Sequence, residues 1–189
     1  MRNLLIDLRF GRPLGGTFFS MRNRTNSYSP FATNSDYVAL TRIFENQVMP
    51  SDVLVDIGCG HGRVINHWLR HYSRNQIIGI ECFHDIAERT RERLKSYDNV
   101  KIITGNALEA LPENGSLFYF YNPFGPESVQ LLKQQFCKLF DRDQKVKFLY
   151  YNCRHVDIFE CDPAWTVTRV NIGGGAASPF SELAILKMS

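Results

Sequence analysis

The stretch from Val53 to Val64 constrains the fold of this chain more than any other. Three apolar residues lead to Asp56, a turn with glycine at every second position follows, and apolar residues at helical spacing come next. This order predicts a buried strand, a tight loop and the N-terminus of a helix. Together these three elements make a pocket for a nucleotide-like ligand.

Strand and helix patterns alternate along the chain on both sides of this stretch. Apolar runs predict five strands of a parallel sheet, at 52–57, 76–81, 99–105, 116–121 and 146–151. Helical spacing predicts helices between them, within 64–72, 86–97 and 126–139. A further helix, capped by Asn34 or Ser35 and ending near Pro50, is predicted before the first of these strands.

Two more strands are predicted near the C-terminus, at 165–171 and 182–188. The link between them contains Gly173, Gly174 and Gly175, which favours a flexible hairpin and an antiparallel pair. The predicted fold class is therefore α/β, doubly wound, with three α/β/α layers. Its sheet has seven strands and is mostly parallel, with an antiparallel C-terminal strand pair.

Residues 1–34 differ in character from the rest and are predicted to form an N-terminal arm or lid, with the folded domain at 35–189. Glycine, serine, asparagine and arginine are frequent in 1–30, which predicts little regular structure there. The net charge is only +3, and before position 25 five arginines are opposed by Asp7 alone. The arm is either a solvated terminus or a contact for an acidic partner such as nucleic acid.

Several residue types are predicted to have no catalytic or metal-binding role. The five cysteines form no C-x-x-C pair, which predicts reduced thiols in a cytoplasmic protein and no metal site. No run of about 18 apolar residues occurs, so no membrane-spanning helix is expected. The charged run 88–95 is interpreted as a solvated helix face, and His61 and His84 are expected to be solvated rather than to act as bases.

Polar residues follow three strands of the predicted sheet, at the ends that meet at one edge. They are the glycine turn after Asp56, Glu81, and Asn122 with its neighbours. The dinucleotide fingerprint G-x-G-x-x-G would need glycine at position 63, where Arg63 stands. A nicotinamide oxidoreductase therefore remains an alternative that Arg63 disfavours. A carboxylate at Glu81 suits both hydroxyls of a nucleoside ribose.

The glycine turn resembles the first motif of the class I S-adenosylmethionine-dependent methyltransferases. That motif is an apolar strand leading to D/E-x-G-x-G-x-G, and residues 56–62 read Asp-Ile-Gly-Cys-Gly-His-Gly. The resemblance extends to the acidic residue after the second strand, a third-strand loop at 105–107, an Asn-Pro-Phe element after the fourth strand and the terminal strand pair. It covers about residues 35–189, and its first motif is the specific part.

The resemblance implies S-adenosylmethionine as cofactor, S-adenosylhomocysteine as product, and a set of contacts. The methionine end would lie against Asp56, Gly58 and Gly60, and Cys59 and Gly62 of the same loop would also contact the cofactor. The ribose would bind Glu81, the adenine would lie beside Cys82, Asn106 and Ala107, and a lid segment would add Tyr28 and Thr33, with Asn122 at the methyl group. Alternatives from the residues alone are a space-filling Cys82, a turn residue at Asn106 and a plain linker at 28–33.

The element Asn122-Pro123-Phe124 resembles the D/N-P-P-Y/F motif of amino methyltransferases, although the second proline is missing. In that motif the Asn side chain and a backbone carbonyl orient a target amine, so these three residues are the candidate catalytic group. Asn-Pro is also a common start of a turn. The predicted function is methyl transfer to a nitrogen of a small molecule or a protein side chain. Alternatives are an RNA methyltransferase that uses the basic arm, and a cofactor-binding protein without turnover.

Overall fold

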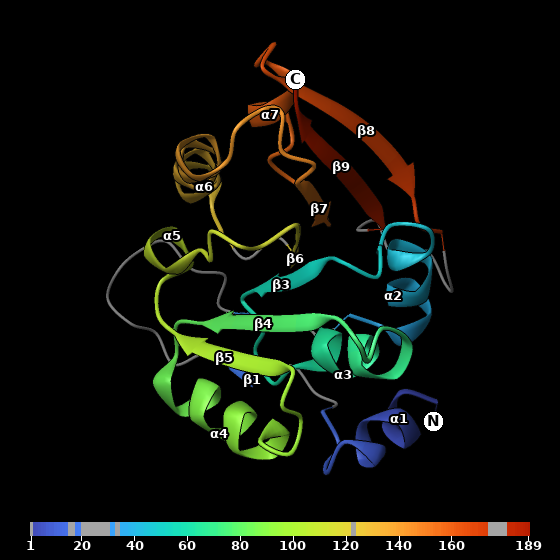
Figure 1. Ribbon diagram of the computed structural model, residues 1–189. Coiled ribbons are helices and arrows are strands. Elements are labelled where there is room, and N and C mark those ends of the chain that lie inside the picture. The colour runs from blue at the N-terminus through green and yellow to red at the C-terminus, as the bar shows by residue number, and fades with distance from the viewer. Residues whose placement is uncertain (1, 15–17, 20–30, 33–34, 122–123, 174–180) are drawn as a thin grey trace.

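The computed structural model describes residues 2–14, 18–19, 31–32, 35–121, 124–173 and 181–189 (Figure 1). Its main feature is a seven-stranded sheet with the strand order β5-β4-β3-β6-β7-β9-β8. The strands are β3 (Val53–Ile57), β4 (Gln76–Glu81), β5 (Val100–Thr104), β6 (Leu117–Tyr121), β7 (Lys147–Tyr151), β8 (Trp165–Asn171) and β9 (Glu182–Met188). All pairs are parallel except β7 with β9 and β8 with β9.

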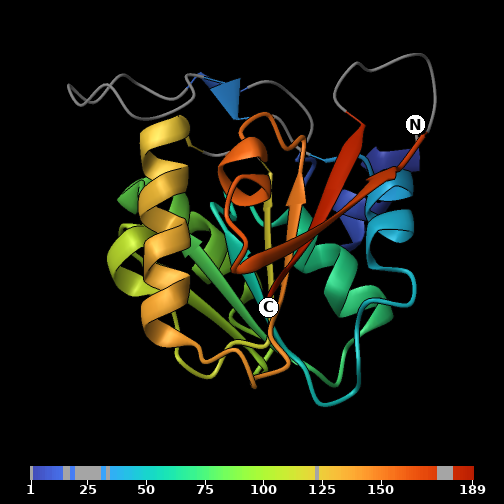
Figure 2. The ribbon, with the colours of Figure 1, turned by 90° about the horizontal axis from the view of Figure 1, so that it is seen from above.

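Helices cover both faces of the sheet, as Figure 2 shows for α2 and α6 on opposite sides. One layer holds α1 (Arg2–Arg9), α2 (Tyr37–Phe44), α3 (Arg63–His71) and α4 (His84–Leu94). The other layer holds α5 (Ala107–Ala110), α6 (Pro126–Leu139) and α7 (Asp157–Glu160). No helix in the described part of the chain is long and apolar enough to cross a membrane.

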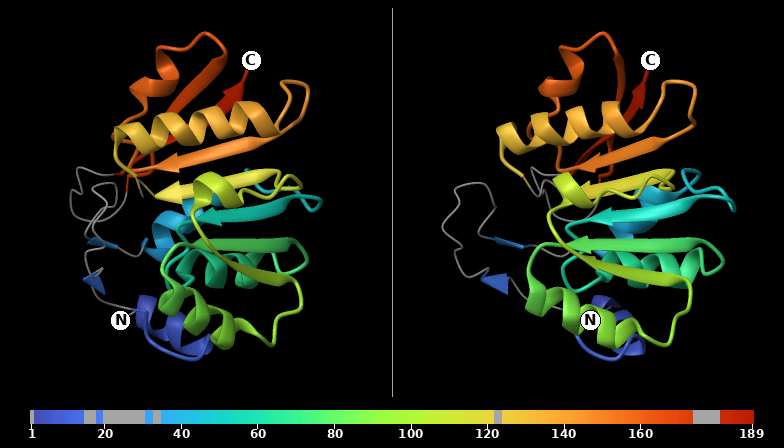
Figure 3. Two further views of the ribbon diagram at one scale, coloured as in Figure 1. Left: turned by 90° about the vertical axis from the view of Figure 1, so that its left-hand side faces the viewer. Right: turned by 60° about the vertical axis from the view of Figure 1, so that its left-hand side comes forward.

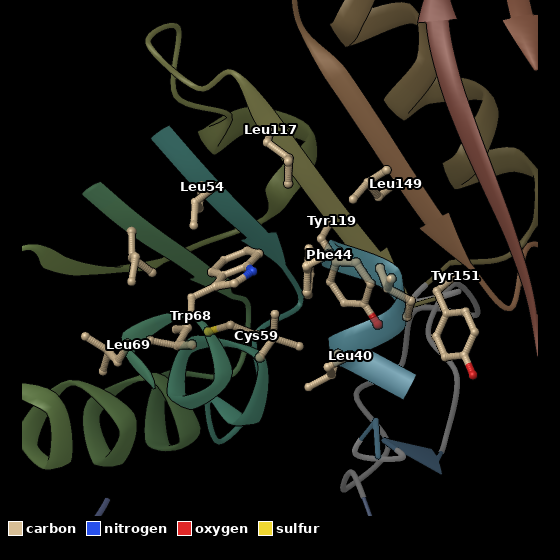
Figure 4. Packing of buried hydrophobic residues seen from close by; sticks show 14 of the residues in the cluster. Leu40, Phe44, Leu54, Cys59, Trp68, Leu69, Leu117, Tyr119, Leu149 and Tyr151 are labelled. Atoms are coloured by element: carbon tan, nitrogen blue, oxygen red, sulfur yellow. The ribbon is translucent and has the colours of Figure 1, made fainter. Parts of the chain in front are cut away.

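Side chains of the strands inside the sheet alternate between two hydrophobic clusters, because successive residues of a strand point to opposite faces. In β3, Leu54 packs under α2 and α3, while Val55 packs in the cluster with α6. Figure 4 shows the first cluster, where Phe44 and Trp68 lie against Tyr119 and Leu54. Burial on both faces accounts for the near-continuous apolar runs that mark the central parallel strands.

The predicted α/β fold is confirmed, including the antiparallel C-terminal pair and its bounds. The helix before β3 is a partial correction. Its N-cap is Asp36, whose carboxylate accepts a hydrogen bond from Val38 N, and not Asn34 or Ser35. It ends at Phe44, well before Pro50, because Asn46 has a left-handed backbone with a φ of 60°.

The prediction of little regular structure in residues 1–30 is wrong for the first part of that segment. Residues 2–9 form α1, and β1 (Phe18–Phe19) pairs with β2 (Phe31–Ala32). The side chain of Asp7 is buried, as is that of Leu14. Helical spacing did not reveal α1 because its leucines face outward and its inward face carries a charged residue. The division of the chain at residue 34 stays a prediction.

Candidate functional site

The loop between β3 and α3, residues 58–62, is held on two sides. The amides of Gly58 and Cys59 both donate to the carbonyl of Ile80 in β4, at 2.9 Å. On the other side, Thr90 of α4 donates its hydroxyl to the Gly60 carbonyl at 2.8 Å. The loop therefore has one fixed conformation above the carboxyl end of the sheet.

Each of the three loop glycines has a positive φ, from 51° at Gly60 to 78° at Gly62. A Cβ at Gly62 would lie 2.9 Å from the guanidinium of Arg93 and 3.1 Å from Thr90 Cγ2, so this glycine is needed for packing as well as for backbone shape. A Cβ at Gly60 would meet no atom within 4 Å. The loop thus exposes open space at Gly60, where a ligand can approach the backbone.

Asp56 lies at the base of this loop, near the end of the central strand β3. Its carboxyl group is buried, and its Oδ2 has no hydrogen-bond partner among the described residues. Burial raises the pKa of this carboxyl well above its usual value, and the charge of Glu81 raises it further. A buried oxygen without a partner is costly, so Asp56 is an acceptor that a cationic or hydrogen-bonding ligand would satisfy.

Glu81 is the buried carboxylate at the end of β4, and it also contacts the loop. Its Oε2 accepts from the Gly60 amide at 2.9 Å, and its Oε1 accepts from Phe83 N at 3.0 Å. The neighbouring Cys82 is exposed as a whole residue, but partial burial of its sulfur raises the pKa of the thiol to about 12, with a further contribution from the charge of Glu81. Cys82 therefore stays a neutral thiol at physiological pH.

The loop after β5 lies next to Glu81, because Gly105 N donates to the Glu81 carbonyl at 3.0 Å. Asn106 caps α5 by accepting from Leu108 N, and Ala107 is buried. The structure thus brings together Asp56, the glycine loop, Glu81, Cys82 and this segment. Phe124 is buried in the cluster under α6. The remaining candidates lie outside the described residues: Tyr28, Thr33, Asn122 and Pro123.

The expectation of a solvated His61 is wrong. This loop residue is 6% exposed, and its Nδ1 accepts from the Arg12 guanidinium at 2.8 Å. Burial lowers the pKa of His61 to about 4, with smaller effects from Arg12, Arg93 and Arg89. The interpretation of 88–95 as solvated fails at Arg93, which donates to the carbonyls of Phe10 and His61 and to Asn66 Oδ1.

The role of Arg63 was also not predicted, although an arginine where the dinucleotide fingerprint has glycine marked the position as unusual. It is the first residue of α3, and its buried guanidinium pairs with Asp7 of α1 at 2.6 Å. Asp7 also accepts from the hydroxyl of Tyr37 at 2.8 Å and from Leu14 N at 3.0 Å. Position 63 thus holds the N-terminal segment against the loop, where a dinucleotide-binding fold would need glycine.

Comparison with known proteins places this site in a recognised domain. Residues 54–122 match the family model described as "Methyltransferase domain". A probable cobalt-precorrin-6B C(15)-methyltransferase (decarboxylating) of Archaeoglobus fulgidus is 39% identical over 62 residues, which are 33% of this chain and 36% of that protein. A tRNA (guanine-N(7)-)-methyltransferase of Eremothecium gossypii is 28% identical over 102 residues, 49% of this chain and 32% of that protein. The matches thus span about a third of each relative.

Solved structures share the fold at low sequence identity. An RNA methyltransferase from Salinibacter ruber, in complex with S-adenosylhomocysteine, has a TM-score of 0.61 and 18% identity, over 82% of this chain and 93% of that one. An O-methyltransferase from Bacillus cereus has a TM-score of 0.63 and 12% identity, over 83% of each chain. The seven-stranded sheet with its antiparallel terminal pair is thus a fold shared with solved methyltransferases, and it is the fold class that the sequence predicted.

Proposed function

We propose that this chain, a class I methyltransferase by its fold and its methyltransferase-domain segment, transfers a methyl group from S-adenosylmethionine to a nitrogen acceptor. The observation that carries the proposal is the buried Oδ2 of Asp56, which has no hydrogen-bond partner among the described residues. It lies near Glu81, which holds the glycine loop where Gly60 leaves open space. This arrangement offers negative charge and free backbone at one place. The cofactor itself would supply the electrophilic methyl group, so the protein needs to provide neither an electrophile nor a metal ion.

The site's residues fit the chemical groups of S-adenosylmethionine. Asp56 would accept from the ammonium group of the methionine end, which would remove the cost of its unpartnered oxygen. Glu81 would accept from ribose hydroxyls with oxygen lone pairs that Gly60 and Phe83 leave free. When bound, the cofactor supplies an electrophilic methyl group on a sulfonium, and direct displacement requires no metal.

The acceptor side of the proposal rests on the element 122–124. Phe120 of β6 lies opposite Ile57 of β3 in the parallel register, so β6 ends beside the start of the glycine loop. In this proposal Asn122 accepts a hydrogen bond from the target amine and turns its lone pair toward the methyl carbon. Asn122 would thus orient the amine. Orientation is the main requirement of this displacement, because the sulfonium sulfur of the cofactor is already an activated leaving group.

An RNA acceptor is the second candidate. The observation that favours it is a group of arginines beside the loop, Arg12, Arg89 and Arg93, which have no carboxylate partner within the described part of the chain. The known relatives give no preference, because their printed names include methylation of carbon, of a tRNA guanine nitrogen and of oxygen.

The first experiment measures binding of S-adenosylhomocysteine by calorimetry. Asp56→Asn should weaken binding at least tenfold without lowering the unfolding temperature, because Oδ2 of the native carboxylate has no hydrogen-bond partner to lose among the described residues. Asp85→Asn is the control, since Asp85 is an exposed carboxylate on α4. Equal affinities of the two variants would remove Asp56 from the proposed site.

The second experiment measures transfer of a labelled methyl group to a panel of amines and to RNA. Asn122→Ala should lower turnover at least a hundredfold while binding of S-adenosylhomocysteine is unchanged. Full methyl transfer by Asn122→Ala would eliminate its proposed role. Binding of the cofactor with no turnover on any acceptor would instead support the cofactor-binding protein without activity.

A further inference from the structure

A surface pocket beside α4 is lined by three arginines. The pocket lies between the segment after α1 and the outer side of α4, and Figure 3 shows these two helices at the same end of the molecule. Its lining residues are Gly11, Arg12, Glu88, Arg89, Glu92 and Arg93. It is separate from the predicted cofactor contacts, because none of these residues is among them.

None of the three arginines has a carboxylate partner among the described residues. Arg93 donates only to carbonyl and amide oxygens. Arg12 donates to the imidazole of His61, and its Nε is buried with no partner. Arg89 makes no hydrogen bond or ion pair with a described residue, and it is exposed on α4.

The two glutamates of the pocket do not neutralise these arginines. Glu88 pairs with Arg91, and Glu92 pairs with Lys95, each one turn along α4. Both carboxylates are therefore balanced by cations that lie outside the pocket lining. The charge that remains in the pocket is that of Arg12, Arg89 and Arg93.

Arg63, in the same region, differs from the three arginines of the pocket. It is buried and is matched by the carboxylate of Asp7. Burial of a guanidinium without a counter-charge is costly, and proteins usually pair such a group. Burial lowers the pKa of Arg93, and repulsion by Arg12 lowers it further. The arginine pocket is therefore short of negative charge in the free protein.

We propose that the arginine pocket, formed by Arg12, Arg89 and Arg93, is a binding site for a phosphate group. A phosphate offers at least two charged oxygens with several lone pairs, and planar guanidinium groups bind it through paired hydrogen bonds. Single-stranded RNA and free pyrophosphate both carry this chemistry. The site lies outside the cofactor loop, so its test does not depend on methyl transfer.

The experiment measures binding of a fluorescein-labelled single-stranded RNA by anisotropy at several salt concentrations, and binding of pyrophosphate by thermal shift. The test variant is the double substitution Arg12→Ala with Arg89→Ala. The matched control is Arg74→Ala with Arg142→Ala, which removes the same charge at exposed positions away from the pocket. Binding of S-adenosylhomocysteine and the unfolding temperature are measured for both, to show that each variant is folded.

The test variant should bind RNA at least tenfold more weakly than the control. The slope of log K against log salt should also fall by about one for each phosphate that the variant no longer binds. Stabilisation by pyrophosphate that the test variant alone loses would also support the site, and would assign it to a free phosphate compound. The proposal is overturned if the two double variants lose binding equally, or if the wild-type protein binds neither probe.

Discussion

The ion pair between Asp7 and Arg63 allows a direct test of how α1 is attached. Asp7→Ala would leave the guanidinium of Arg63 buried without its counter-charge. It would also remove the acceptor for the Tyr37 hydroxyl and for Leu14 N. Breaking a buried pair by removing one partner costs about 3–5 kcal/mol, which is a large part of the stability of a typical domain.

Urea unfolding followed by circular dichroism measures this loss. With a denaturant slope of about 2–3 kcal/mol per molar, the midpoint should fall by about 1–2.5 M. Asp85→Ala, which removes an exposed carboxylate of α4, should change the free energy of unfolding by less than about 1 kcal/mol.

A double-mutant cycle separates the pair from its surroundings. Arg63→Ala combined with Asp7→Ala should be less destabilising than the sum of the two single substitutions, because the second change removes the uncompensated charge. A loss below about 1 kcal/mol for Asp7→Ala, or strict additivity in the cycle, would refute the conclusion that a buried ion pair docks α1.

Two further predictions concern the loop and the core. Gly62→Ala should lower the free energy of unfolding by about 2–3 kcal/mol, because φ is positive and the new Cβ would meet Arg93. Gly60→Ala should lower it by only about 1 kcal/mol and should mainly weaken S-adenosylhomocysteine binding. Equal effects of the two variants in thermal unfolding and in calorimetry would contradict this prediction. Burial lowers the pKa of His67 to about 3, so the unfolded chain binds the proton more strongly and stability is lost as pH falls below about 6.5. The part of this loss due to His67 should reach about 2 kcal/mol at pH 5. His67→Gln should remove that part, whereas the exposed control His84→Gln should leave the pH dependence of stability unchanged. The same loss of stability at pH 5 in His67→Gln as in the wild-type protein would reject the assignment.

The sequence predicted the sheet well because the signals for strands and for the glycine loop lie in short, continuous runs of residues. Apolar runs such as 76–81 mark buried strands directly, and the glycines at 58, 60 and 62 each require a backbone conformation that other residues rarely adopt. The loop, Asp56 and Glu81 could therefore be placed at one edge of the sheet from the sequence alone.

The N-terminal segment could not be predicted in the same way. The pairing of Asp7 with Arg63 joins residues whose positions in the sequence give no periodic signal. His61 was expected in solvent because a loop histidine usually is, but Arg12 and Arg93 close over it from distant parts of the chain. Burial of polar residues through long-range pairs is invisible to spacing rules, which detect only apolar faces.

The contacts of α1 also bear on the order of events during synthesis. The helix α1 leaves the ribosome before α3 and α4, yet Asp7 must wait for Arg63, 56 residues later, and Phe10 must wait for Arg93, 83 residues later. Long-range contacts of this kind form late, since the loop that they close must first be ordered. We therefore expect α1, with three exposed leucines and an aspartate that has not yet met Arg63, to stay undocked on the nascent chain until α3 and α4 have emerged and folded.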